Sequence, residues 1–122
     1  ILKAIAETEV LTAQNTKANL NLCFNYGGHD EITYAARQIV REGVSPDDIT
    51  PQLIKSHLYT AELPPADIIV RTSGEQRLSN FLLWDSAYAE LIFVPEMWPE
   101  FNEASLDGVL SEYAQRQRRF GK

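Results

Sequence analysis

The chain has 122 residues, of which 44% are hydrophobic and 23% charged, and its formal net charge is −6. This size allows one domain at most, and the composition is typical of a soluble globular protein rather than a disordered one. The negative charge argues against nucleic acid as a partner held by a broad basic surface, and no apolar run approaches the roughly 18–20 residues that span a bilayer.

The first third of the chain predicts a helix and then a strand. Helix formers in residues 1–14 predict the end of a helix. Residues 18–26 alternate apolar and polar side chains, which predicts a strand ended by Gly27-Gly28. The only cysteine, Cys23, excludes an intramolecular disulfide and suits a reducing cytoplasm, and its place in this apolar run predicts a buried side chain.

Two helices are predicted next. The first has Asp30 as its N-cap and Gly43 at its C-terminal end. Its buried face is predicted from apolar side chains spaced three and four apart: Ile32, Ala35, Ala36, Ile39 and Val40. Thr50-Pro51, a capping residue followed by proline, predicts the start of a short second helix. Its apolar side chains are Leu53, Ile54 and Leu58.

The last half of the chain predicts parallel strands. Residues 67–70 and 91–94 are short apolar runs, typical of buried parallel strands. Between them, residues 79–89 predict a helix opened by Ser79. A final helix is predicted from the apolar side chains Leu106, Val109, Leu110 and Tyr113. The order of elements predicts an α/β fold, an open and mostly parallel sheet flanked by helices.

Polar chemistry concentrates in residues 71–80, which follow the first of these apolar runs. Ligands of open parallel sheets bind beyond the carboxyl ends of strands, where helix N-termini point outward. Arg71 and Arg77 offer forks of donors suited to phosphate oxygens, beside hydroxyls and the expected helix start at Ser79. The segment therefore predicts an anion site that a diphosphate would fit. Surface salt bridges of both arginines with Glu75 or neighbouring acids are the alternative.

Glu90 is a second candidate, since it lies directly before an apolar strand. An enzyme that uses diphosphates usually needs Mg²⁺, bound by one or two carboxylates together with phosphate oxygens and water. Glu90 could supply one such ligand, and a capping or salt-bridged role is the alternative.

At these residues the chain resembles the cis-prenyltransferase family, of the undecaprenyl diphosphate synthase type. The most specific match is the run from Arg71 to Trp84, continued through Ala87 to Leu91. Other matching motifs, in order and correctly spaced, are Asn25-Tyr26-Gly27-Gly28, residues 97–101 (MWPEF) and residues 118–121 (RRFG).

The resemblance implies a reaction in which isopentenyl diphosphate units are added in cis to an allylic diphosphate, typically farnesyl diphosphate, with Mg²⁺. A product such as undecaprenyl diphosphate, the lipid carrier for cell-wall synthesis, is implied with it. Site roles follow by motif position and are likewise only implied. They place the diphosphate of isopentenyl diphosphate on Arg71, Arg77 and Ser79, Mg²⁺ on Glu90, a pocket edge at Asn25, and a dimer-crossing element at Arg119 and Gly121.

Some of the family's pattern is altered or missing. His29, Gln76 and Asp85 differ from the residues common there, which puts any proton-handling role of the first two in doubt. The Asp-Gly-Asn-Gly-Arg-Trp motif of the family's N-terminal half, whose aspartate binds Mg²⁺, does not occur in this sequence. We therefore expect residues 1–122 to be the C-terminal half of a single cis-prenyltransferase domain, cut at Ile1 and inactive alone.

The resemblance implies a homodimer, with Trp98 as a candidate contact, and a cytoplasmic protein with peripheral membrane contact. A non-catalytic partner subunit of a heteromeric cis-prenyltransferase is one alternative. A plain diphosphate-binding module of another fold family is a second.

Overall fold

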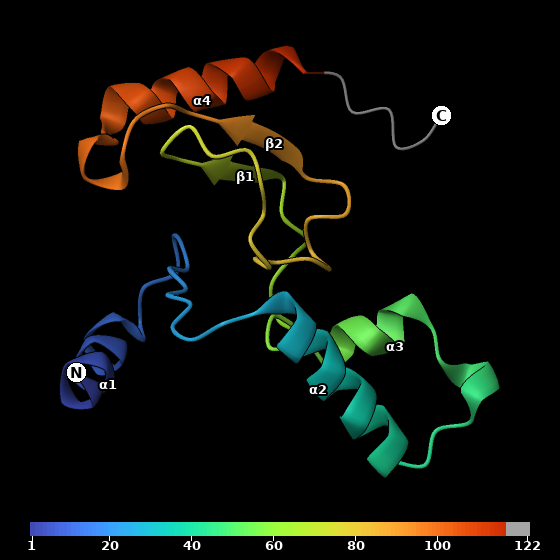
Figure 1. Ribbon diagram of the computed structural model, residues 1–122. Coiled ribbons are helices and arrows are strands. Elements are labelled where there is room, and N and C mark those ends of the chain that lie inside the picture. The colour runs from blue at the N-terminus through green and yellow to red at the C-terminus, as the bar shows by residue number, and fades with distance from the viewer. Residues whose placement is uncertain (117–122) are drawn as a thin grey trace.

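The computed structural model describes residues 1–116 of the chain. Its helices are α1 (Leu2–Thr12), α2 (Gly28–Arg41), α3 (Pro51–Ser56) and α4 (Glu103–Gln115), with single 3₁₀ turns at Pro46–Asp48 and Trp98–Glu100. Its strands are β1 (Ile68–Arg71) and β2 (Glu90–Phe93). Figure 1 shows α4 lying along the two strands, while α2 and α3 lie together at the other end of the molecule.

The two strands form a small parallel sheet, which confirms the predicted α/β fold with a parallel sheet flanked by helices. Ile69 and Ile92 are its buried side chains, and α4 packs on β2 with Val109 buried. Leu106 and Leu110 were predicted on the same buried face of the last helix, but both are exposed. Because Ile69 pairs with Leu91 and Ile92 pairs with Val70, the two buried side chains lie on opposite faces of the sheet.

Helix α2 begins three residues earlier than predicted. Its N-cap is Gly27, in an extended conformation, and the N–H of Glu31 donates to the Gly27 carbonyl at 3.0 Å. Asp30 therefore lies inside the first turn, and its prediction as N-cap is wrong. Gly43 is confirmed at the C-terminal end, with φ +71° and its N–H bonded to the Val40 carbonyl.

The buried face of α2 is confirmed in part. Ala35 and Ile39 are buried, whereas Ala36 and Val40 are exposed. Helix α3 begins as predicted, because the Thr50 hydroxyl accepts the Leu53 N–H at 3.1 Å and proline follows at the first helical position. Leu58, just beyond this helix, is buried.

The predicted strand over residues 18–26 is wrong. These residues have no regular secondary structure, and β1 and β2 pair only with each other within the described residues. An alternating pattern becomes a strand only when a neighbouring strand satisfies its backbone groups, and the described part of the chain places none beside this segment. Leu20, Leu22 and Phe24 are exposed, and Cys23, predicted to be buried, is exposed with them.

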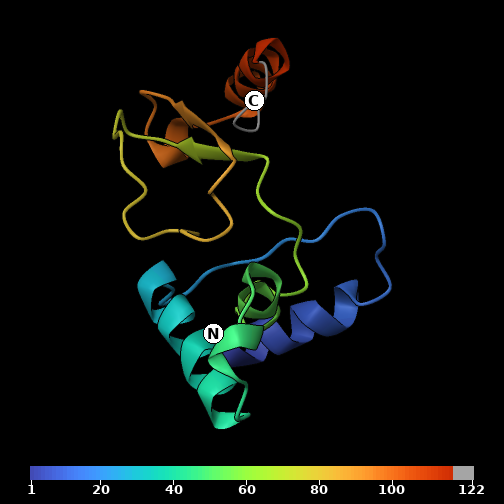
Figure 2. The same cartoon turned by 90° about the vertical axis from the view of Figure 1, so that its right-hand side faces the viewer.

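The predicted helix over residues 79–89 is also wrong. This stretch is a series of turns, with Ser79, Asn80 and Leu82 at φ of +50°, +65° and +45°. Backbone in the left-handed region cannot continue a right-handed helix. Figures 1 and 2 show the chain between β1 and β2 running from the sheet toward the start of α2 and back.

Candidate functional site

The segment of residues 71–80, hereafter the arginine segment, leaves the carboxyl end of β1 and is tied to the loop after β2. The N–H groups of Ser73 and Gly74 donate to the carbonyls of Glu96 (2.7 Å) and Val94 (2.9 Å). Gly74 has φ +66°, a conformation that glycine adopts without strain, so the chain turns sharply here. These backbone bonds fix where the arginine segment begins.

The middle of the arginine segment is exposed and rich in unused donors. Within the described residues, the backbone N–H groups from 75 to 79 donate to no other group of the protein. The Arg77 side chain is 62% exposed and pairs with Glu75, which is the alternative role considered for it above. An exposed pair of this kind contributes about 0–1 kcal/mol, so an anionic ligand could displace Glu75 at little cost.

Arg71 occupies the last position of β1 and is half-buried. Across the part of the chain that the structure describes, its guanidinium makes no ion pair with an acidic side chain. A surface salt bridge therefore accounts for Arg77 but not for Arg71. Ser79 is exposed. All three predicted phosphate-binding residues therefore lie in one segment, and each is at least partly exposed to solvent.

Asn80 ends the arginine segment at the N-terminus of α2. Its carbonyl accepts the Gly28 N–H at 2.7 Å, and its side-chain Oδ1 accepts the His29 N–H at 2.8 Å. The helix start beside the arginine segment is therefore that of α2, not one at Ser79, and Asn80 already occupies two of its amides. A Cβ on Gly27 would lie 2.7 Å from Asn80 Nδ2, and one on Gly28 would lie 2.8 Å from Leu83 Cγ.

The glycine pair therefore permits the close approach of the Asn25–Gly28 motif to the arginine segment. Asn25, predicted at the pocket edge, is exposed with φ +50°. Tyr26 follows it and stacks edge-to-face on Phe81, with ring centroids 5.7 Å apart. The structure thus brings two motifs together that are about fifty positions apart in the sequence.

A buried polar network, which sequence reasoning missed, lies behind this contact. Glu31 is 0% and Asp85 is 5% exposed. Thr60 joins them: its N–H donates to Glu31 Oε1 at 3.1 Å and its hydroxyl to Asp85 Oδ2 at 2.5 Å. Lys55 Nζ lies 2.6 Å from Asp85 Oδ1 and 2.7 Å from the Thr60 carbonyl. The Tyr26 hydroxyl donates to Glu31, and its burial together with this bond raises the pKa of the tyrosine.

One signal could have identified part of this network. Glu31, Ala35 and Ile39 are spaced four residues apart, so helical geometry places the carboxylate on the buried stripe. A buried carboxylate needs hydrogen-bond partners. Its partners come from sequence positions that no local pattern connects.

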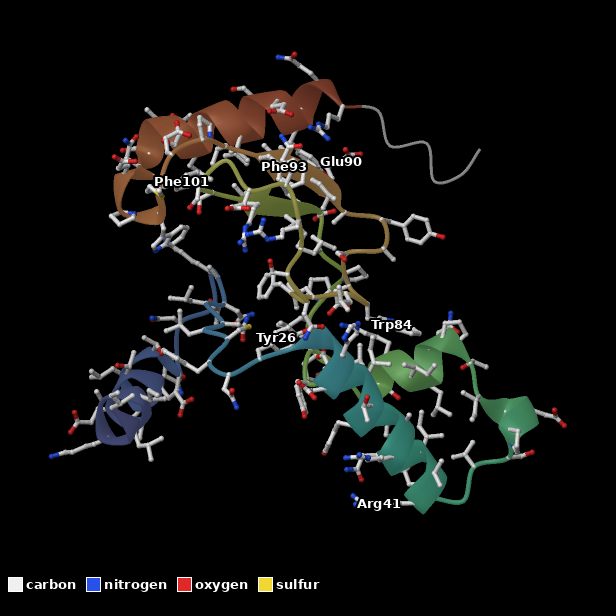
Figure 3. The ribbon with its side chains drawn as sticks, in the orientation of Figure 1. Tyr26, Arg41, Trp84, Glu90, Phe93 and Phe101 are labelled. Atoms are coloured by element: carbon white, nitrogen blue, oxygen red, sulfur yellow. The ribbon has the colours of Figure 1, made fainter. Side chains whose placement is uncertain are left out.

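Glu90 lies at the opposite end of the sheet from Arg71. The register pairs Ile68 with Glu90 and Arg71 with Phe93, so the two candidates are three positions apart, about 10 Å along the strands. Figure 3 shows Glu90 beneath the end of α4. There its Oε2 pairs with Arg116 Nη1 at 2.9 Å, and Arg116 also pairs with Glu112.

These contacts bear on the Mg²⁺ prediction. The bonds to Glu112 and then Glu90 raise the pKa of Arg116, whose positive charge now faces both carboxylates. Among the described residues no group of three potential metal ligands converges. Glu90 is thus salt-bridged, which is the alternative considered for it, and an Mg²⁺ ion held with a diphosphate and water would require Arg116 to release this carboxylate. The predicted roles of Arg119 and Gly121 lie outside the described residues.

Comparison with known proteins decides the family. The family model described as "Putative undecaprenyl diphosphate synthase" matches residues 1–121. The chain belongs to the undecaprenyl diphosphate synthase, or cis-prenyltransferase, family. A farnesyl-diphosphate-specific ditrans,polycis-undecaprenyl-diphosphate synthase of Haemophilus ducreyi is 50% identical over 98% of this chain and 51% of its own length. An isoprenyl transferase of Agrobacterium fabrum is 51% identical over 99% of this chain and 51% of its own length.

Two solved structures have the same fold over nearly the whole of this chain. Lavandulyl diphosphate synthase from Lavandula x intermedia, in complex with dimethylallyl diphosphate, matches 99% of this chain with a TM-score of 0.91 and 38% identity. A probable undecaprenyl diphosphate synthase from Campylobacter jejuni matches 98% with a TM-score of 0.83 and 28% identity. These matches cover 54% and 55% of the two solved chains. The chain likewise spans about half the length of the curated relatives it matches. None of its described helices is long and apolar enough to cross a membrane.

Proposed function

We propose that this chain is the C-terminal half of a cis-prenyltransferase that adds isopentenyl diphosphate units in cis to farnesyl diphosphate. The product is a polyprenyl diphosphate such as undecaprenyl diphosphate, and the 122 residues by themselves are inactive. One observation carries the proposal. In a member of this family, Arg71, Arg77 and Ser79 share a segment that is anchored at both ends and exposed in the middle.

The arginine segment would bind the diphosphate of isopentenyl diphosphate. Its unused backbone N–H groups and the Ser79 hydroxyl can donate to phosphate oxygens, and two guanidinium groups supply positive charge. Arg77 would exchange Glu75 for the ligand. Holding the diphosphate in this way directs the carbon–carbon double bond of the substrate toward the allylic carbon, and such positioning supplies much of the rate.

The chemical step follows from that positioning. The double-bond electrons of isopentenyl diphosphate form a bond to the allylic carbon of farnesyl diphosphate. The allylic carbon–oxygen bond breaks, and diphosphate leaves with its electron pair. A proton then leaves the extended chain and restores a double bond. Mg²⁺, when bound, neutralises charge on the leaving group, and Glu90 is the carboxylate that the described residues offer it.

A homodimer fits the proposal. Trp98 is exposed and stacks on Phe101 at a centroid distance of 5.9 Å, so an apolar surface is available near the end of the sheet. Arg119 and Gly121 would then reach the site of the second copy. Peripheral contact with a membrane would let the hydrophobic polyprenyl product pass into the bilayer.

Arg77→Ala tests the proposal in the full gene product that contains these residues. Loss of charged hydrogen bonds to a diphosphate should raise KM for isopentenyl diphosphate about 10- to 100-fold, and KM for farnesyl diphosphate should stay unchanged. Steady-state kinetics with each substrate varied in turn measures both constants. Arg41→Ala, which removes an exposed arginine at the far end of α2, is the matched control (Figure 3).

An unchanged KM for isopentenyl diphosphate in an active Arg77→Ala enzyme would refute the assignment. The proposal that this is the C-terminal half has its own test, the coding sequence upstream of Ile1. An in-frame Asp-Gly-Asn-Gly-Arg-Trp motif is expected there. A gene product without that motif, inactive alone but activating a catalytic subunit, would instead establish the partner-subunit function.

A further inference from the structure

Asn80 joins the arginine segment to α2 through both its backbone and its side chain. Its carbonyl oxygen lies 2.7 Å from the Gly28 nitrogen and its Oδ1 lies 2.8 Å from the His29 nitrogen. Both amides belong to the first turn of α2, where helical bonding leaves them without acceptors. Asn80 therefore caps a helix that is about fifty positions away in the sequence.

The conformation of Asn80 suits asparagine. Its φ of +65° lies in the left-handed region, which asparagine adopts more readily than other residues with a Cβ. Ser79, the neighbouring residue, has φ +50°. Two successive left-handed residues form a sharp bend, and the cap on α2 fixes the direction in which that bend presents Ser79 and Arg77.

Residues 75–79 are held mainly from their two ends. At one end the bonds from Ser73 and Gly74 hold the segment to the loop after β2, and at the other end Asn80 holds it to α2. Between these anchors the backbone N–H groups donate to nothing else in the described residues. A segment of this kind must be ordered before it can bind a ligand, and each residue ordered on binding costs affinity.

We propose that Asn80 is a positioning residue that holds the arginine segment ready for a diphosphate by capping α2. This inference rests on the proposed function, because the ligand is the diphosphate of isopentenyl diphosphate. Without the Asn80 side chain the bend loses its fixed conformation. Substrate binding must then offset the conformational entropy lost when the bend is ordered, so the affinity falls. Once the substrate is bound the segment is ordered again, so the effect falls on KM and not on kcat.

Asn80→Gly isolates the side-chain bond. Glycine adopts positive φ freely and keeps the carbonyl bond to Gly28, so only the acceptor for His29 is lost. In the full gene product, KM for isopentenyl diphosphate should rise about tenfold, with kcat and KM for farnesyl diphosphate within twofold of the parent. Calorimetric titration of isopentenyl diphosphate into the same variants should show the same loss of affinity without turnover.

The chain offers a matched control. Asn102 caps α4 with its side chain, whose Oδ1 accepts the Ala104 N–H at 2.9 Å. Asn102→Gly removes a comparable cap away from the arginine segment, so it should lower the melting temperature as much as Asn80→Gly and leave KM unchanged. Equal changes of KM in both variants, or none in Asn80→Gly, would overturn the positioning role. If Arg77→Ala also leaves KM unchanged, the proposed function itself fails; if it raises KM, only the role of Asn80 is refuted.

Discussion

At the scale of single residues, the most consequential feature is a set of charges buried together behind the arginine segment. Asp85 is almost fully buried and receives hydrogen bonds from Lys55 and Thr60, which tie residues 80–85 to α3 and the loop after it. The Trp84 side chain lies beside the Lys55–Asp85 pair (Figure 3). It forms part of the edge of a groove of about 650 Å³ that is lined by α3 and the turns after Asn80. A buried ion pair of this kind matters for stability mainly because either charge, buried without its partner, has a large desolvation cost.

Removing one partner of that ion pair should therefore be costly. Lys55→Met leaves the Asp85 carboxylate buried without its cation, and the free energy of unfolding should fall by about 3 kcal/mol. Urea denaturation at pH 7 measures this loss. Lys3→Met, which removes an exposed pair with Glu7, should change stability by about 0.5 kcal/mol or less. The double variant Lys55→Met/Asp85→Leu should recover most of the loss, and an equally unstable double variant would contradict this account.

The contacts of His57 should make stability depend on pH. His57 Nδ1 lies 2.8 Å from the Leu53 carbonyl and Nε2 lies 3.0 Å from Glu42 Oε2. Both nitrogens can donate only in the protonated imidazole, and the bonds to Leu53 and then Glu42 raise its pKa. Since the folded pKa exceeds the unfolded value of about 6.5, this stabilisation is present below pH 6.5 and is lost as pH rises through the folded pKa.

The melting temperatures of the parent chain and of His57→Gln check this sign. The parent should melt higher at pH 6, and the difference should shrink by pH 9. Glu42→Gln should reduce the same difference, because it removes the charge that the imidazolium faces. A difference that is constant from pH 6 to pH 9 would show that the histidine does not titrate in this contact.

At the scale of elements, the start of α2 packs so closely against the turns after Asn80 that neither can change its backbone conformation alone. Gly28→Ala would place a Cβ 2.8 Å from Leu83, so helix and turns must separate, and we expect a loss of about 1–3 kcal/mol in stability. Gly108 lies within α4, and a Cβ there meets nothing within 4 Å. Gly108→Ala should therefore stabilise the chain by up to about 1 kcal/mol. Thermal denaturation of both variants tests this contrast, and a loss of stability in both would contradict it.

The sheet shows how elements separate candidates that the sequence places close together. Arg71 and Glu90 are nineteen positions apart and both adjoin apolar strands. Because the strands are parallel and in register, one residue lies at the carboxyl end and the other at the amino end. The predicted phosphate and metal ligands therefore do not meet within the described part of one chain.

At the scale of the whole molecule, burial is limited. Within the described residues, the buried apolar side chains fall into two groups, one on the sheet and α4 and one on α2 and the residues after α3: Ile69, Ile92 and Val109, then Ala35, Ile39 and Leu58. Helix α1 has no buried residue, and the apolar side chains of residues 20–24 face solvent. Exposed apolar surface on this scale accords with a chain that spans about half the length of its curated relatives.

The sequence by itself determined the elements whose signals are local. Helical spacing in α2, the Thr50-Pro51 start of α3 and the apolar runs of both strands each depend on neighbouring residues, and each element formed near its predicted place. The arginine segment was also identifiable, because its chemistry is contiguous. Only the tertiary structure decided the turns of residues 79–89 and the absence of a strand over residues 18–26. The first depends on Asn80 reaching the start of α2, and the second on a neighbouring strand that the described residues do not provide. No local pattern encodes a contact between distant segments, and those contacts determine the backbone at both places.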